Sequence, residues 1–193
     1  MDTAKKISQK YSFEEYVAFE QESKIRHEFQ DGLLIPIEST TKNHNILITN
    51  FLLNANIPKL RKQGCQLFHE NVITEVATTK KGVYPDIVVT CNKEDQKDVL
   101  VVRHPKLIVE VLSKSTASYD KTGKFFKYQR IPSLEQYVLI SQYAYAIEYY
   151  TKMENGQWIY SALDQLDSVL EIPCIDLKIP LSALYEDILL DNS

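Results

Sequence analysis

The chain has 193 residues, of which 44% are hydrophobic and 25% are charged. This balance is ordinary for a globular domain with a buried core, and it excludes a wholly disordered chain. The net charge of −4 argues against a protein that coats nucleic acid through bulk positive charge, although a local basic surface is compatible with it. We expect one domain over 1–193, with 1–10 as a flexible arm and 153–193 as a C-terminal hairpin and short helix packed on the same domain.

Neither a membrane anchor nor a secretory leader is visible. No stretch approaches the roughly 18 apolar residues of a membrane span, and the N-terminus lacks the apolar segment of a signal peptide. We therefore expect a cytoplasmic protein without a membrane partner. Cys65, Cys91 and Cys174 form no C-x-x-C pair, so we read neither a disulfide nor a zinc site from them. Cys65 and His69 would be at most half of a zinc site.

Three segments have helical character. Ser12 and Glu15 have the spacing of a capping box and predict the start of the first helix. Apolar residues at intervals of three and four predict a second helix over 43–57, with Pro58 disrupting its end. A third helix is predicted from about 115 to 130, where an Ile-Pro dipeptide stops it.

Short runs of β-branched and aromatic residues predict the strands. Pro36 confines one strand, over 33–37, to an edge or irregular position, and Asn155-Gly156 predicts a hairpin turn. The other strands are expected over 66–69, 72–77, 83–90, 107–112, 137–141, 145–151, 158–162, 169–172 and 177–179. Helices and strands in this order predict a mixed α/β (α+β) domain.

Two of the strand segments each contain a carboxylate. Asp86 follows Tyr84-Pro85 and precedes an apolar run, and Glu110 is flanked by apolar residues as in a strand buried on both faces. An ionised carboxylate there is costly unless it meets a cation or several donors. Two carboxylates on neighbouring strands can share a divalent ion, and their hard oxygen ligands suit Mg²⁺. In the alternative reading, Asp86 faces an edge and Glu110 pairs with a structural lysine or arginine.

These segments resemble the Uma2 (Uma-two) family of bacterial proteins described as putative restriction endonucleases, a branch of the PD-(D/E)XK nuclease superfold. The resemblance rests on RHEFQDGLLI, KNHNILITNFL, YPDIVV, LIVEVLSKSTASYDKTGKFFKY and IPSLEQYVLI, in family order. It implies a restriction-endonuclease-like central mixed β-sheet flanked by helices, a Mg²⁺ (or Mn²⁺) cofactor and DNA as the substrate. On this similarity Asp86 and Glu110 are metal ligands and catalytic residues. Glu28, which we take as a residue of the N-terminal helix, completes the acidic cluster.

One position departs from the superfold pattern. The pattern has a lysine two residues after the acidic strand residue, and Leu112 stands there. Lys124 matches the family's helix lysine and shares a helix face with Asp120 at i, i+4, so we expect it to be the catalytic lysine, within about 6 Å of the carboxylates. Lys127 is the reserve candidate. The alternative is an ordinary surface pair between Lys124 and Asp120.

The segment 114–130 carries four more basic than acidic residues, whereas the rest of the chain is strongly acidic. We expect Lys114, Lys121, Lys127 and Arg130 to bind the phosphate backbone of DNA. A solvated helix face would have the same composition. The aromatic residues of this segment, Phe125, Phe126 and Tyr128, are expected to face the core.

The resulting hypothesis is a Mg²⁺-dependent DNA endonuclease in which Asp86 and Glu110 hold the metal and a helix lysine assists. The alternative is a catalytically degenerate relative that binds nucleic acid or a protein partner, and Leu112 is its best support. A homodimer is also expected, because two sites related by a two-fold axis suit cleavage of both strands. The tyrosine-rich segment 143–150 and Trp158 would supply its aromatic interface, unless they are core residues.

Overall fold

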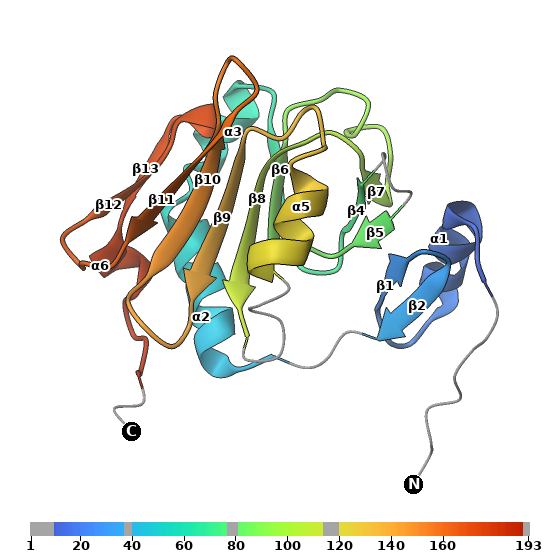
Figure 1. Cartoon of the computed structure of the whole chain (residues 1–193), viewed down its shortest axis with the longest axis horizontal. Coiled ribbons are helices and arrows are strands. Elements are labelled where there is room, and N and C mark those ends of the chain that lie inside the picture. Colours follow the sequence, from blue (N-terminus) through green and yellow to red (C-terminus); the bar gives the residue numbers. More distant parts are fainter. Residues whose placement is uncertain (1–9, 37–39, 77–80, 114–119, 191–193) are drawn as a thin grey trace, which may run out of the picture.

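The structure is a computed structural model that describes residues 10–36, 40–76, 81–113 and 120–190. Its centre is a six-stranded sheet. The order is β11-β10-β9-β8-β6-β3, with β8 and β9 parallel and the other neighbours antiparallel (Figure 1). A mixed sheet with flanking helices is the predicted fold class. The strands are β3 Gln66–His69, β6 Ile87–Thr90, β8 Pro105–Leu112, β9 Gln136–Ser141, β10 Ile147–Lys152 and β11 Trp158–Leu163.

A second sheet of five strands has the order β2-β1-β5-β4-β7. Its strands are β1 His27–Gln30, β2 Leu33–Pro36, β4 Ile73–Val76, β5 Lys81–Val83 and β7 Val101–Val102. The edge position predicted from Pro36 is confirmed, because β2 is the outer strand. Gly82 pairs with Phe29 of β1, and a Cβ at Gly82 would lie 2.4 Å from the ring of Tyr16. Glycine is therefore needed for the N-terminal segment to pack this closely on β5.

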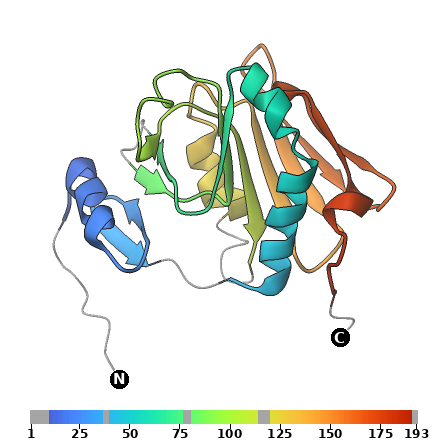
Figure 2. The ribbon, with the colours of Figure 1, turned by 180° about the vertical axis from the view of Figure 1, so that it is seen from behind.

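Helices cover both faces of the six-stranded sheet (Figures 1 and 2). On one face α2 packs on apolar side chains such as Val109 and Val111, and the short β12-β13 sheet and α6 add to the same core. On the other face Tyr128 packs against Ile108 and Leu112. The helical elements are α1 Phe13–Glu22, α2 Lys42–Asn54, α3 Ile57–Lys62, a π-helical turn Asp120–Lys124, α5 Phe125–Tyr128, a 3₁₀ turn Pro173–Ile175 and α6 Leu181–Leu184, and the remaining strands are β12 Val169–Ile172 and β13 Leu177–Pro180.

Local capping explains where the helices begin. Ser12 and Glu15 form the predicted capping box, in which the Ser12 amide donates to the Glu15 carboxylate and the Glu15 amide donates to Ser12 Oγ. Thr41 caps α2 by accepting from the amide of His44. Pro58 was predicted only to disrupt the end of the preceding helix. It lies in the first turn of α3, a helix that was not predicted from the sequence. Proline is well suited to the first turn of a helix.

Two further expectations need correction. The strand predicted over 83–90 is split between β5 and β6, which belong to different sheets, with Pro85 and Asp86 between them. Proline cannot donate to a strand ladder, so the chain leaves one sheet there and enters the other. The helix predicted over 115–130 is described only from Asp120, where it begins as a π-helical turn. Its first residues lie outside the described ranges.

The prediction that the cysteines form no disulfide is also wrong for two of the three. Cys65 and Cys91 form a disulfide. Cys65 precedes β3 and Cys91 follows β6, and these strands are antiparallel with Gln66 opposite Thr90. The strand register therefore brings together two cysteines that are 26 residues apart in the sequence. No helix of the described residues is long and apolar enough to cross a membrane.

Candidate active site

Glu110 occupies the middle of the six-stranded sheet. It lies on β8 between β6 and β9, and its side chain is 5% exposed. Lys124 Nζ donates to Glu110 Oε1 at 3.0 Å, and the Tyr128 hydroxyl donates to the same oxygen at 3.0 Å. Burial raises the pKa of the Tyr128 hydroxyl, which keeps it protonated as a donor. The helical segment that covers this face thus gives the buried carboxylate two donors.

Lys124 is surrounded by carboxylates. Besides Glu110, its ammonium lies 3.0 Å from Asp120 Oδ1 and 3.6 Å from Glu28 Oε1. Burial by itself would lower the pKa of Lys124, but the charges of Glu110, Glu28 and Asp120 raise it well above the usual range. Lys124 therefore remains a cation. The predicted proximity of Lys124 to the acidic strand residue is found for Glu110.

Asp86 is held from two directions. Its Oδ2 accepts a hydrogen bond of 2.6 Å from the amide of Val111, the residue after Glu110. Its Oδ1 lies 3.1 Å from Nε2 of His44, in the first turn of α2. His44 Nδ1 is buried and has no hydrogen-bond partner in the described part of the chain. From the sequence, His44 is a helix-start residue that could line the groove, and nothing in its spacing indicates a catalytic base.

The charges of this cluster are not balanced. Glu28, Asp86, Glu110 and Asp120 are four carboxylates, and Lys124 is the cation among them. The pKa of the Glu110 carboxyl is raised to about 8, chiefly by burial and further by Asp86 and Asp120, against the opposing effect of Lys124. A site in which a carboxylate is difficult to ionise can be stabilised by a second cation.

The donor chemistry is compatible with Mg²⁺. The described residues contain no group of three or more His, Cys, Asp or Glu side chains placed to hold a metal ion. Mg²⁺ is usually bound through one or two carboxylates and retains several waters, so a large protein cage is not required. Asp86 immediately precedes β6, which pairs with the strand β8 that carries Glu110, and the Asp86 charge acts on Glu110. These two carboxylates are the residues that fit such an ion.

Comparisons with known proteins identify the family of this chain. Residues 13–182 match the Uma2 family, described as "Putative restriction endonuclease". The chain belongs to the Uma2 family. Two similar proteins from Synechocystis sp. are "Uncharacterized protein slr1290", 32% identical over 179 residues (91% of this chain, 92% of the relative), and "Uncharacterized protein sll1609", 34% identical over 152 residues (77% and 85%).

A solved structure shares the fold. The crystal structure of "a putative nuclease belonging to DUF820" from Anabaena variabilis superposes with a TM-score of 0.74 and covers 93% of this chain and 99% of the other. The sequences are 15% identical, so the likeness concerns the fold alone.

Within this Uma2 fold, Leu112 occupies the place of the superfold lysine. Its side chain is buried in the core under Tyr128 and Ile108. A lysine at 112 would have to share that apolar space. Lys124 instead reaches Glu110 from the helical segment, 14 residues further along the chain.

Glu28 needs a correction. It lies on β1, not on a helix, and its carboxylate meets Lys124 from the five-stranded sheet. The strand directs His27 and Glu28 to opposite faces, as alternating burial along β1 indicates. Thus the acidic cluster is assembled from both sheets.

The four residues predicted to bind DNA do not share one environment. Lys114 lies outside the described residues. Lys121 forms an ion pair with Glu148 of β10. Arg130 is exposed and its guanidinium lies 4.3 Å from the ring centre of Phe126, which is 57% exposed and so does not face the core as predicted. Lys127 is partly exposed on α5.

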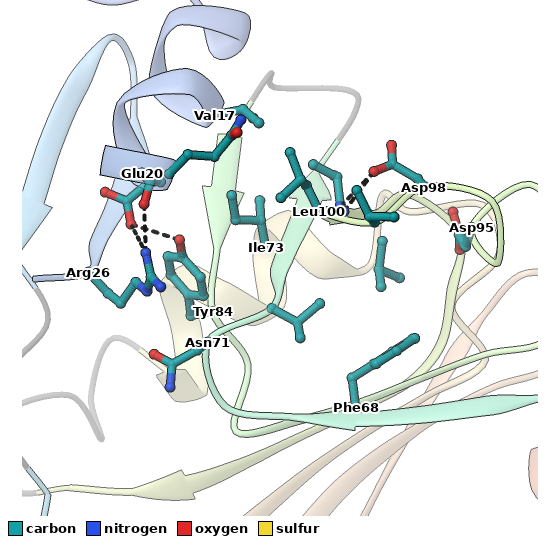
Figure 3. A pocket seen from close by; sticks show the side chains of 15 residues that line it. Val17, Glu20, Arg26, Phe68, Asn71, Ile73, Tyr84, Asp95, Asp98 and Leu100 are labelled. Carbon is teal, nitrogen blue, oxygen red and sulfur yellow. Dashed lines mark hydrogen bonds and ion pairs between the residues drawn. The ribbon is translucent and has the colours of Figure 1, made fainter. Parts of the chain in front are cut away.

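A network around the buried Glu20 joins the N-terminal segment to Tyr84 (Figure 3). Glu20 of α1 is 2% exposed, and it accepts from the Tyr84 hydroxyl at 2.8 Å and lies 2.8 Å from His27 Nδ1. Arg26 donates to the Glu20 carbonyl at 2.7 Å. Glu20, Arg26 and Tyr84 line a pocket of about 280 Å³. Tyr84 is two residues before Asp86, and His27 is next to Glu28. The network therefore connects the two chain segments that carry the Asp86 and Glu28 carboxylates.

Proposed function

We propose that the protein is a divalent-metal-dependent endonuclease that hydrolyses phosphodiester bonds of DNA. The observation that carries this proposal is the contact of the Lys124 ammonium with Glu110, Asp120 and Glu28. A buried cation inside a surplus of carboxylates suits a phosphoryl-transfer site, because it offers one fixed positive charge and a place for a metal ion. Membership of the Uma2 family supports the same reaction class.

Each residue has a role in this proposal. Asp86 and Glu110 would hold Mg²⁺, which when bound supplies a Lewis acid for the phosphoryl oxygen and a water of lowered pKa. Lys124 holds a positive charge where negative charge develops on the phosphoryl group. Glu28 contacts Lys124, and we propose that it acts through a water at the site. His44 and the Val111 amide fix the Asp86 carboxylate from opposite sides.

DNA would approach along the helical segment that begins at Asp120. Lys121, Lys127 and Arg130 lie on or just after it, and we propose that they contact backbone phosphates, together with Lys114. Because Lys121 is paired with Glu148, part of its charge is compensated in the free protein. A phosphate would have to compete with that carboxylate.

Nicking of supercoiled plasmid with Mg²⁺ or Mn²⁺ tests the proposal. Asp86→Asn and Glu110→Gln should each abolish metal-dependent nicking while the fold is kept, because each removes a ligand charge at nearly constant volume. Glu28→Gln should have a smaller effect. Glu171→Gln is the matched control, since it neutralises an exposed carboxylate of β12 that pairs with Lys178.

A non-catalytic binding module is the second candidate, and Leu112 in place of the motif lysine favours it. Calorimetric titration with Mg²⁺ or Mn²⁺ separates the two. Metal binding that depends on Asp86 and Glu110, together with nicking, supports the nuclease. DNA binding without metal binding or nicking would instead establish the non-catalytic module.

A further inference from the structure

An aromatic groove lies between α5 and the strands β10 and β11 of the six-stranded sheet. It has a volume of about 640 Å³, which is within the range of small-ligand sites. Four rings and two side-chain amides line it, whereas no Asp, Glu, Lys or Arg of the described residues does. The lining groups are Phe125, Tyr150, Trp158, Tyr160, Gln129 and Gln157.

The groove lies on the same face of the six-stranded sheet as the candidate active site. Ile108, Tyr137, Tyr150 and Tyr160 are direct partners across β8, β9, β10 and β11, so their side chains share one face of the sheet. Glu110, two residues after Ile108, projects from that same face. Phe125, at the edge of the groove, follows Lys124 directly in the chain. A substrate strand bound at Lys124 would run along this face toward the aromatic rings.

The rings are arranged as a surface on which a flat group can stack. Phe125 stacks on Tyr150 with centroids 3.7 Å apart, and Trp158 meets Phe125 edge-on at 5.7 Å. Tyr160 lies 5.4 Å from Tyr150 and is 53% exposed. Core aromatic side chains are enclosed, whereas this cluster leaves ring area open to solvent beside two amides that can pair with the polar edge of a base.

Cations lie at the rim. Lys152 is the cross-strand partner of Trp158, and its ammonium donates to the carbonyl of Pro132. Arg130 follows the groove residue Gln129 and stacks on Phe126. The Glu148 carboxylate contacts the Tyr160 hydroxyl, and its charge is paired with Lys121. Aromatic rings with ammonium and guanidinium groups beside them match the chemistry of an unpaired nucleotide, which has a flat base and an anionic phosphate.

We propose that this groove binds unpaired bases of single-stranded DNA, by stacking on Trp158 and Tyr160, while the same strand passes Lys124. This inference rests on the proposed nuclease function for its substrate and names the unpaired strand as the form recognised. A second copy of the chain is the competing occupant, because β11 is an edge strand of the sheet.

Trp158 is the single tryptophan of the chain, so its fluorescence reports on the groove directly. The titration uses a 12-nucleotide oligothymidylate, an abasic 12-mer with the same phosphates, and a 12-base-pair duplex, all in EDTA so that cleavage is irrelevant. Saturable quenching by the oligothymidylate, with little by the abasic strand or the duplex, is expected. Tyr160→Ala should weaken oligothymidylate binding roughly tenfold or more, the loss typical of one stacked base. Tyr143→Ala, at a tyrosine outside the groove, is the control and should bind as the wild type does.

Three results would overturn the inference. Equal quenching by the abasic strand would mean that phosphates alone are bound. An unchanged affinity in Tyr160→Ala, measured also by anisotropy of a labelled oligonucleotide, would exclude stacking in the groove. Emission that depends on protein concentration, with a dimer in sedimentation and no response to the oligonucleotide, would assign the groove to a second copy. Plasmid nicking that persists in any of these cases would leave the proposed nuclease function standing. Quenching without nicking would support binding of single strands in the groove and count against the nuclease function.

Discussion

The ammonium of Lys124 lies 3.0 Å from Oε1 of Glu110, although the two residues are 14 positions apart and come from a helical turn and a central strand. The contact places a cation next to the buried carboxylate of the candidate active site. It also explains how this Uma2 chain can have Leu112 in its core and still present a positive charge at the candidate active site.

Lys124→Ala tests directly whether Lys124 takes the role of the motif lysine. Removing one preorganised charge donor typically lowers turnover by about 10²-fold or more, and we expect this loss in nicking rate. Metal affinity should be largely kept, because Lys124 is not a metal ligand in the proposal. Lys178→Ala, at an exposed lysine of β13, is the control. Nicking by Lys124→Ala at the wild-type rate would show that Lys124 is structural.

The raised pKa of Glu110 gives a stability prediction. Its pKa is about 8 in the folded protein against an ordinary value of 4.5, so between these values the folded state retains a proton that the unfolded state has lost. The contribution of Glu110 to stability is therefore fully present below about pH 4.5, falls as the pH rises, and is lost above about pH 8. Without metal, the free energy of unfolding of the wild type should decline relative to Glu110→Gln by up to about 1.4 kcal/mol per pH unit across this window.

Chemical denaturation at several pH values in EDTA measures this difference. Glu171→Gln should show no such trend, because Glu171 is an exposed surface carboxylate. A difference between wild type and Glu110→Gln that stays flat from pH 4.5 to 8 would contradict a raised pKa at Glu110.

His44 gives a separate prediction for the Asp86 side of the site. Its Nε2 lies 3.1 Å from Asp86 Oδ1, so it orients the carboxylate that we propose as a metal ligand. Loss of such an outer partner commonly costs 10- to 100-fold in metal affinity. We expect His44→Ala to weaken Mn²⁺ binding by roughly tenfold in calorimetry, with His44→Gln intermediate because its amide can still donate. His69→Ala, at an exposed position of β3, is the control. Equal affinities for all four proteins would remove His44 from the site.

The sequence predicted those parts of the site that have a short sequence pattern of their own. An apolar run interrupted by one carboxylate predicted the buried strand of Glu110, and four-residue spacing predicted that Lys124 and Asp120 would meet. The likeness to the Uma2 family supplied the pairing of these segments and the role of Lys124. Local periodicity alone left an ordinary surface ion pair equally open.

The missed parts depend on contacts between distant segments. His44 meets Asp86 because α2 packs across the end of β6, which no short pattern encodes. Glu28 contacts Lys124 from β1, a strand of the five-stranded sheet that is far from Lys124 in the sequence. The disulfide between Cys65 and Cys91 follows from the register of β3 and β6. In each case, tertiary packing determines a proximity for which sequence spacing gives no signal.

The last prediction concerns the Glu20 network, which we regard as a positioning device for Glu28. Burial raises the pKa of Tyr84 well above its usual value, so its hydroxyl stays protonated and donates to the buried Glu20 carboxylate. Tyr84→Phe leaves that carboxylate with one donor fewer and should lower the free energy of unfolding by about 1–3 kcal/mol. Tyr143→Phe, at a more exposed tyrosine, should change stability much less.

A double-mutant cycle distinguishes positioning from mere destabilisation. If Tyr84 acts on nicking through Glu28, then Tyr84→Phe should lower the nicking rate in the wild-type background, under conditions where both proteins are folded, and have little further effect in Glu28→Gln. Mn²⁺ affinity should not change, since neither residue is a proposed metal ligand. A full additional loss of nicking in the double variant would show that Tyr84 acts independently of Glu28. The network would then serve only to attach α1 to the sheet that carries β1.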